Sequence, residues 1–268
     1  MSKLEIFEVS VPQLDSTRTV RVYLPAEYFQ NNKKKLPVLY MHDGQNLFDD
    51  KTAFCGKSWD ARKTLDNLIG KKVIPPMIIV GVDNGDDQRR FEYSPWVNSY
   101  GGELLGLSHS IGGKGDAYAD FFVNTLMDII NKKYRVLTDF NNTFISGSSL
   151  GSFISIYIMA KYPDRFSKVG AFSTASWAAE ECFLKYIKSS ALGKNEAFYI
   201  YVGTKETSNQ FLPNFPKIYQ DCSENLKDAL IENGCDEKSI KYVVGENEIH
   251  NEASWRKFFP DFIKWIFE

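Results

Sequence analysis

The chain has 268 residues, enough for one large domain or two small ones, and its shares of hydrophobic (43%) and charged (25%) residues are ordinary for a globular protein. Its 32 basic and 34 acidic residues leave a net charge of −2, which argues against nucleic acid or an anionic membrane as a partner. The first residues lack the basic-then-apolar order of a signal peptide, and no apolar run approaches the roughly 20 residues of a membrane helix. The four scattered cysteines show no C-x-x-C spacing, which favours reduced thiols, so we expect a cytoplasmic protein.

Four stretches predict β-strands in the first third of the chain. Residues 4–11 and 17–24 alternate apolar and polar side chains and are joined by a polar link, a pattern typical of an antiparallel pair. Residues 36–41 and 77–82 are continuous apolar runs, as in strands that are buried on both faces. The first part of the chain is therefore expected to supply both the antiparallel edge and the first buried strands of a sheet.

Residues 86–115 show no clear periodicity. A structureless stretch of about thirty residues is unusual inside a compact domain and often forms a lid or a binding loop. This stretch is rich in side chains that line pockets, namely Arg89, Arg90, Tyr93, Trp96 and Tyr100. We therefore expect a lid or substrate-binding loop here.

Helices and strands alternate over the rest of the chain. Helices are expected over 58–69, 117–134, 153–162, 216–233 and 254–265, and strands over 143–146, 168–173, 198–202 and 239–244. Ser58 and Ser254 are the expected N-caps of the first and last helices, and Gly70 is expected to end the first. Such alternation predicts the α/β class, with a mostly parallel sheet and helices on both faces. Without a repeat or a linker, residues 1–268 are interpreted as a single domain.

The sequence Gly147-Ser148-Ser149-Leu150-Gly151 fits the G-x-S-x-G pattern of a nucleophile elbow. In that motif a serine lies on a strained turn between a strand and a helix, and the flanking glycines leave room for the turn. An expected strand precedes this sequence and an expected helix follows it. The pattern therefore predicts Ser149 as a nucleophile, with the N–H of Leu150 as an oxyanion donor.

A serine nucleophile needs a base and a group that orients the base. The triad order of the fold is Ser, then Asp or Glu, then His, and His250 is the only histidine after Ser149. Glu206 follows the strand expected over 198–202 and is the expected acid. The alternatives Asp221 and Asp236 lie on the apolar helix and beyond its end, and we expect both to face solvent.

The loop after the strand expected over 36–41 is the second candidate part of the site. His42 is expected to be a hydrogen-bonded brace, and the backbone around Gly44 or Gln45 can supply a second oxyanion donor. A metal site is the rival interpretation, because His42 and Asp43 are close in sequence to Asp49 and Asp50. No H-E-x-x-H or similar spacing supports that interpretation, so we expect no metal and no cofactor.

Several phrases, spread over the chain in order, resemble one family. They are Tyr40 to Asp49, Arg90 to Trp96, the elbow, Gly203 to Glu206, and His250 to Trp255. They are similar to the putative esterase family of alpha/beta hydrolases, which includes enterochelin-esterase-like enzymes, carbohydrate esterase family 1 and S-formylglutathione hydrolases. The likeness runs from about Leu36 to Trp265.

The resemblance implies an alpha/beta-hydrolase fold and a serine esterase with Ser149 as nucleophile, His250 as base and Glu206 as acid. Many relatives carry Asp where this chain has Glu206. The expected substrates are small acyl esters: acylated sugars, phenolic esters or siderophore-type esters. Aromatic and loop side chains are the candidate substrate-binding residues, namely His42, Asp43, Phe48, Tyr93, Trp96, Trp177 and Trp255. An acyltransferase with an alcohol acceptor, or a binding protein without catalysis, are the alternatives.

Overall fold

The computed structural model describes residues 1–192 and 195–268. Its contacts divide the chain into two compact units. Unit 1 comprises residues 1–84, 120–145 and 251–268, and unit 2 comprises residues 85–119 and 146–250. The expectation of a single domain stays a prediction, and each unit is described separately.

Unit 1 contains four strands in the order β1-β2-β4-β3. Their bounds are Lys3–Val11 (β1), Ser16–Leu24 (β2), Val38–His42 (β3) and Ile78–Val82 (β4). The pairs β1–β2 and β2–β4 are antiparallel, whereas β3–β4 is parallel. The alternating pattern therefore predicted the antiparallel pair β1–β2 correctly. The two apolar runs predicted buried strands correctly, since β3 and β4 are buried along their whole length.

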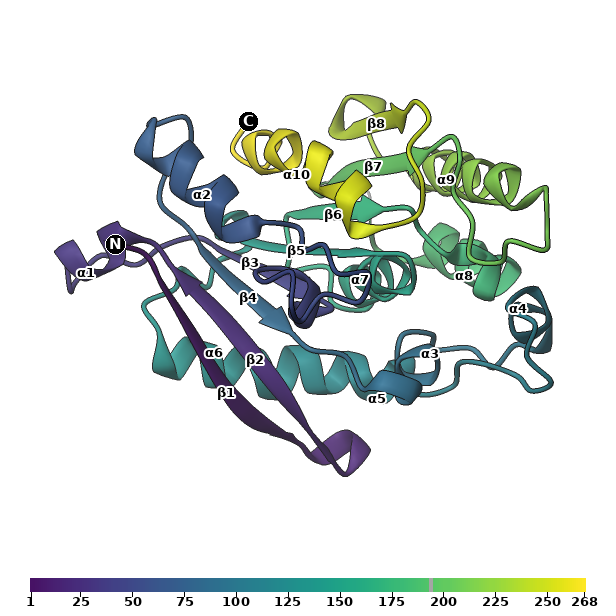
Figure 1. Ribbon diagram of the computed structural model, residues 1–268, viewed down its shortest axis with the longest axis horizontal. Helices are drawn as coiled ribbons and strands as arrows, with labels where there is room; N and C mark the ends of the chain where they lie inside the picture. Colours follow the sequence, from purple (N-terminus) through teal and green to yellow (C-terminus); the bar gives the residue numbers. More distant parts are fainter. Residues whose placement is uncertain (193–194) are drawn as a thin grey trace. The chain divides into compact units, whose positions relative to one another are not determined.

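Helices lie on both sides of the unit 1 strands. Their bounds are Ala26–Gln30 (α1), Ala61–Gly70 (α2), Met127–Lys133 (α6) and Glu252–Trp265 (α10). Figure 1 shows α2 and α10 on one side of these strands and α6 on the other. A π-helical segment, Phe121–Leu126, precedes α6, so the helix expected over 117–134 is not a regular α-helix throughout.

Both expected serine caps in unit 1 are wrong. Ser58 lies before α2 and donates its hydroxyl to Asp50, while Asp60, in the left-handed region at φ 51°, stands at the cap position. The N-cap of α10 is Asn251, whose side chain accepts a hydrogen bond from the backbone N–H of Ser254 at 2.9 Å. Asparagine is as good a cap as serine, and its bond to the third residue on is the usual capping geometry. Helix α10 therefore begins at Glu252, and its cap residue directly follows His250.

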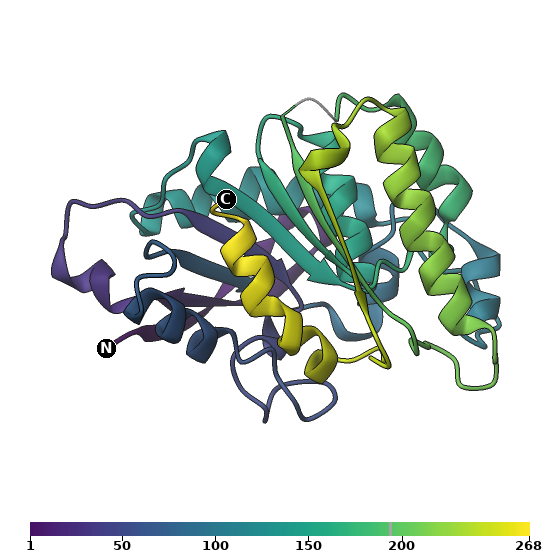
Figure 2. The same cartoon turned by 90° about the horizontal axis from the view of Figure 1, so that it is seen from above.

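Unit 2 contains the three parallel strands β6 (Lys168–Phe172), β7 (Ala197–Gly203) and β8 (Ile240–Gly245). The strand β5 (Thr143–Ser148) begins in unit 1 and ends in unit 2. The helices are α7 (Leu150–Lys161), α8 (Glu180–Ser189) and α9 (Phe215–Glu232). Helix α7 packs on β6 and α9 on β7, and Figure 2 shows α9 lying along these strands. Eleven of the twelve residues of α7 are buried, as expected of a helix that is apolar on all sides.

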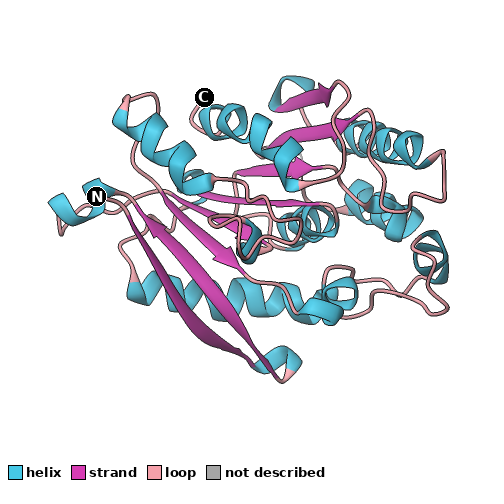
Figure 3. Cartoon of the chain, viewed as in Figure 1, coloured by secondary structure: helices cyan, strands magenta, loops and turns pink. Residues whose placement is uncertain are grey.

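The segment 86–115 is less irregular than its sequence predicts. It contains the short helices α3 (Arg89–Glu92) and α4 (Ser99–Leu104), and α5 (Gly115–Asp120) begins at its end. Each has one or two turns, too few to produce a visible period in the sequence. Figure 3 shows these helices joined by loops, and a bridge between Asn98 and Ile111 closes the segment on itself.

Candidate active site

The turn between β5 and α7 carries Ser149 in a backbone conformation that is rare for a residue with a side chain. Its φ is 60° and its ψ is −128°. A Cβ atom at Gly147 would lie 2.5 Å from the carbonyl carbon of Gly151, so the first glycine of the motif is needed because the turn folds back on the helix. The N–H of Ser149 donates to the carbonyl of Phe172 at 2.9 Å, which ties the turn to the end of β6.

The start of α7 and the side chain of Arg89 lie next to Ser149 in the sequence or in space, and both favour negative charge nearby. Leu150 is the first residue of α7, where N–H groups lack a carbonyl partner within the helix and the helix dipole favours negative charge. The guanidinium of Arg89 lies 3.4 Å from the carbonyl oxygen of Ser148. Arg89 lies in the segment expected to form a binding loop, and it extends to the residue before the serine.

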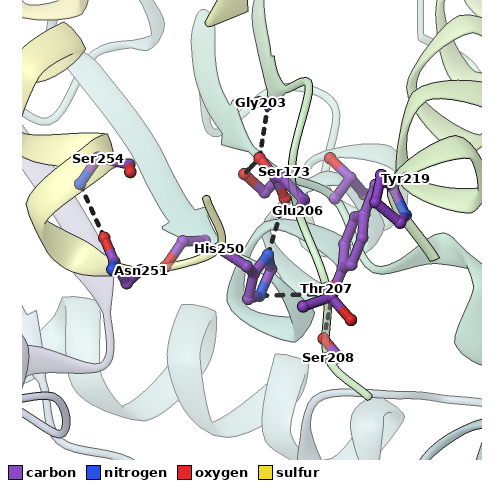
Figure 4. A network of polar contacts seen from close by, with 12 residues as sticks. Ser173, Gly203, Glu206, Thr207, Ser208, Tyr219, His250, Asn251 and Ser254 are labelled. Atoms are coloured by element: carbon purple, nitrogen blue, oxygen red, sulfur yellow. Dashed lines mark hydrogen bonds and ion pairs between the residues drawn. The ribbon is translucent and has the colours of Figure 1, made fainter. Parts of the chain in front are cut away.

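Glu206 and His250 are in direct contact in unit 2. The Nδ1 atom of His250 lies 2.8 Å from Oε2 of Glu206 (Figure 4). Glu206 follows β7 and is fully buried, whereas the side chain of His250 keeps 12% of its surface exposed. A buried carboxylate on Nδ1 fixes the proton at that nitrogen and leaves Nε2 as the basic atom of the neutral ring.

The second carboxylate oxygen of Glu206 is held by two further donors. Its Oε1 accepts from the N–H of Gly203 at 2.6 Å and from the hydroxyl of Ser173 at 2.5 Å. Burying a carboxylate is costly unless hydrogen bonds replace those of water. The ends of β6 and β7 supply this replacement, so the acid is fixed from two strands. Ser173 was not identified from the sequence, which shows only a serine at a strand end.

The alternative acids and the third histidine are engaged elsewhere. Asp221 forms an ion pair with Lys217 at 2.7 Å on α9. Asp236 is exposed and accepts a hydrogen bond from the N–H of Lys238. His109 is exposed and stacks on Phe91.

Tyr219 of α9 is a neighbour of His250 that the sequence did not indicate. The centroids of its ring and of the imidazole are 4.6 Å apart, with 33° between the two ring planes. Its hydroxyl oxygen lies 3.4 Å from Nε2 of His250 and 2.5 Å from the hydroxyl oxygen of Ser208. Burial raises the pKa of Tyr219, and the neighbouring Ser208, hydrogen-bonded to it, and Ser149, among others, lower it in part. The tyrosine hydroxyl is therefore close both to the imidazole and to the serine of the elbow. The sequence predicted a helix over 216–233 but no role for Tyr219.

The aromatic candidates in unit 2 have different surroundings. Trp177 is buried and meets the ring of Tyr219 edge-on at 6.2 Å, so it lies beside the polar cluster. Trp96 is half-buried against aromatic rings of α7 and α8. Tyr93 is fully buried and packs 5.0 Å from Tyr118, as a core side chain does. Of the three, Trp177 has the contacts nearest to His250.

The remaining candidates belong to unit 1. His42 is buried and packs 4.8 Å from the ring of Phe122. Asp43 has a φ of 56° and accepts from the side chain of Asn84 at 2.7 Å. A Cβ atom at Gly44 would lie 2.7 Å from the backbone carbon of Gly81, so only glycine fits there.

Gln45, Phe48 and Trp255 complete the unit 1 candidates. The side-chain oxygen of Gln45 accepts from the N–H of Asn84 at 3.2 Å, and Trp255 stacks on Trp59 at 5.8 Å. Phe48 is half-buried. A part in oxyanion or substrate binding stays a prediction for these residues. Over residues 1–192 and 195–268, no group of three or more His, Cys, Asp or Glu side chains is arranged to hold a metal ion, and no helix is long and apolar enough to cross a membrane.

A family model described as "Putative esterase" matches residues 12–266. The chain belongs to this family. It is 22% identical to the uncharacterized protein YbbA of Bacillus subtilis (strain 168) over an alignment of 250 residues. This alignment covers 93% of this chain and 92% of that protein. It is 25% identical over 258 residues to an endo-1,4-beta-xylanase/feruloyl esterase of Xylanibacter ruminicola, which covers 94% of this chain and 29% of that protein.

Solved structures agree with the fold of the family. An IroE-like serine hydrolase from Shewanella oneidensis matches with a TM-score of 0.77 and 19% identity, over 98% of this chain and 79% of that one. As a putative esterase family member, the chain is a serine carboxylic-ester hydrolase with the alpha/beta-hydrolase fold. The family and the fold expected from the sequence are both confirmed.

We expect Ser173→Ala to destabilise the protein by about 1–3 kcal/mol, because the substitution removes a donor from a fully buried carboxylate. Urea unfolding measures this change. Ser189→Ala is the matched control, since that serine is exposed and its loss should change stability by about 0.5 kcal/mol or less. Equal small effects for the two variants would contradict the importance of this bond.

Proposed function

We propose that the chain hydrolyses small carboxylic esters through Ser149, His250 and Glu206. The single observation that carries the proposal is the 2.8 Å contact between Nδ1 of His250 and Glu206, within the unit that also carries the strained Ser149 turn. The hydroxyl of Tyr219 lies 3.4 Å from Nε2 of His250, and Ser149 is among the groups that lower the pKa of Tyr219, which supports a common site for the base and the nucleophile.

In the proposed reaction, the hydroxyl oxygen of Ser149 attacks the ester carbonyl while Nε2 of His250 takes its proton. The carboxylate of Glu206 accepts the hydrogen bond from Nδ1–H and stabilises the imidazolium that forms. The imidazolium then protonates the leaving alcohol as the tetrahedral intermediate collapses to an acyl-enzyme. Water attacks the acyl-enzyme with the same base, which releases the acid and restores the hydroxyl of Ser149.

The negative oxygen of the tetrahedral intermediate needs donors that are already in place. We assign the first to the N–H of Leu150 at the start of α7. For the second donor, the backbone around Gly44 and Gln45 stays the prediction made from the sequence. The close approach of Gly44 to Gly81 and the left-handed backbone of Asp43 are consistent with a loop whose backbone groups have a fixed direction.

The variants Ser149→Ala, His250→Ala and Glu206→Gln test this proposal. We expect the first two to lower kcat for a p-nitrophenyl ester by about 10⁴-fold or more, because nucleophile and base act as a unit. Glu206→Gln should also lower kcat strongly, because an amide in place of the carboxylate no longer stabilises the imidazolium. Steady-state kinetics of the folded variants measure these changes.

Asp221→Asn is the matched control for Glu206→Gln, since it removes a carboxylate that pairs with Lys217 on the surface of α9. Its kcat should equal that of the unmodified protein. If Ser149→Ala retained full activity, the proposed nucleophile would be wrong. If Glu206→Gln alone retained full activity, another residue would have to be the acid of the triad.

We further propose a phenolic acyl ester as the substrate class. The relative from Xylanibacter ruminicola is named as a feruloyl esterase, and the buried ring of Trp177 packs against Tyr219 next to the proposed base. Acetyl, butyryl, feruloyl and catechol-siderophore esters distinguish this class from the others. The feruloyl ester should give the highest kcat/KM, and equal values for acetyl and feruloyl esters would contradict the assignment.

Two alternatives share the fold. An acyltransferase would pass the acyl group to a sugar or another alcohol, which product analysis with added acceptors detects. A binding protein would not react with a fluorophosphonate. A cytoplasmic location stays a prediction, consistent with four cysteines that are all free.

A further inference from the structure

The catalytic imidazole proposed above has a second polar neighbour on the side opposite to Glu206. Tyr219 is fully buried, its ring lies 4.6 Å from the imidazole, and its hydroxyl lies 3.4 Å from Nε2 (Figure 4). The hydroxyl of Ser208, on the loop between β7 and α9, lies 2.5 Å from that of Tyr219. His250 is thus contacted at both nitrogens and on one ring face by side chains of unit 2.

A hydroxyl at this position can serve both protonation states of the imidazole. The single lone pair of Nε2 in the neutral ring must accept the proton of Ser149, so the tyrosine hydrogen is directed to Ser208 and the tyrosine oxygen faces Nε2. When Nε2 carries that proton, the N–H can be shared between the tyrosine oxygen and the leaving alcohol, while the tyrosine hydrogen stays directed to Ser208. No covalent bond changes at either hydroxyl, because each keeps its own proton.

The tyrosine keeps that proton at working pH, because burial raises the pKa of Tyr219 and the nearby Glu206 raises it further. Trp177 and Ser149 are neighbours that lower the pKa of Tyr219, and their effect is smaller than that of burial. A buried, neutral hydroxyl cannot compete with His250 as the base. It can orient the ring.

We propose that Tyr219, held by Ser208, is a positioning residue that keeps Nε2 of His250 directed at its proton-transfer partners through both protonation states of the cycle. This inference rests on the proposed function of His250 as the base. Tyr219 acts through the imidazole and need not touch the substrate. The consequence is specific: the tyrosine hydroxyl should affect formation and hydrolysis of the acyl-enzyme alike, because one imidazole serves both steps.

The test compares Tyr219→Phe, which keeps the ring against the imidazole and removes only the hydroxyl, with the unmodified protein. We expect kcat to fall about tenfold, the factor that corresponds to one hydrogen bond, with KM unchanged within about twofold. Pre-steady-state kinetics with a p-nitrophenyl ester should show that both the burst rate and the later turnover decrease. Ser208→Ala should act in the same direction with a smaller factor.

The double variant Tyr219→Phe/Ser208→Ala should be no slower than Tyr219→Phe alone, because Ser208 acts only through the tyrosine hydroxyl. Tyr134→Phe is the matched control. Tyr134 is also a buried tyrosine, and its hydroxyl donates to Glu5 at 2.8 Å, so its loss should lower stability without changing kcat. Thermal unfolding of all variants separates a loss of stability from a loss of rate.

Three results would overturn the inference. An unchanged kcat in Tyr219→Phe would show that the tyrosine only fills space. A change confined to KM would make it a substrate contact. Slowing of the burst alone would tie it to the leaving group and not to the imidazole. If Ser149→Ala were also fully active, the proposed function itself would have failed, which the same assay reveals separately.

Discussion

A fully buried carboxylate is the constraint on which the site depends. Glu206 has no exposed surface, and an isolated carboxylate in such a place would be strongly destabilising. Its partners come from three separate segments: the end of β7 at Gly203, the residue after β6 at Ser173, and the loop before α10 at His250. The need to satisfy one charged group therefore holds three segments in a single arrangement. The carboxyl ends of parallel strands are where open α/β sheets form their sites.

The segment after β6 joins this carboxylate to the strained serine. Phe172 accepts from the N–H of Ser149, Ser173 donates to Glu206, and Ala175 donates its N–H to the carbonyl of Ser149 at 3.2 Å. A conformation such as that of Ser149 costs about 1–3 kcal/mol and persists only when its surroundings enforce it. The four residues 172–175 thus enforce the turn and orient the acid at once, while the buried helix α7 anchors the other side of the turn.

The local patterns of the sequence predicted much of this arrangement. Continuous apolar runs indicated β3 and β4, and the G-x-S-x-G spacing indicated the turn at Ser149. Contacts between residues that are far apart in the sequence could not be predicted from local patterns. Ser173 and Tyr219 become neighbours of Glu206 and His250 only when β6 and α9 pack on β7, and a serine or tyrosine in these positions resembles many others. Helix α8 was missed altogether, and the cap of α10 was assigned to Ser254 instead of Asn251 because either residue type fits that position.

In the proposed reaction, hydrolysis passes through an ester of Ser149. Rapid acid quenching during turnover of a slow aryl ester, followed by peptide digestion and mass spectrometry, tests it most directly. We predict one acyl group per chain, on the peptide that contains Ser149, which appears with the burst of phenol release and decays once the ester is exhausted. An acyl group on another residue, or continued turnover with no acylated peptide, would contradict the account.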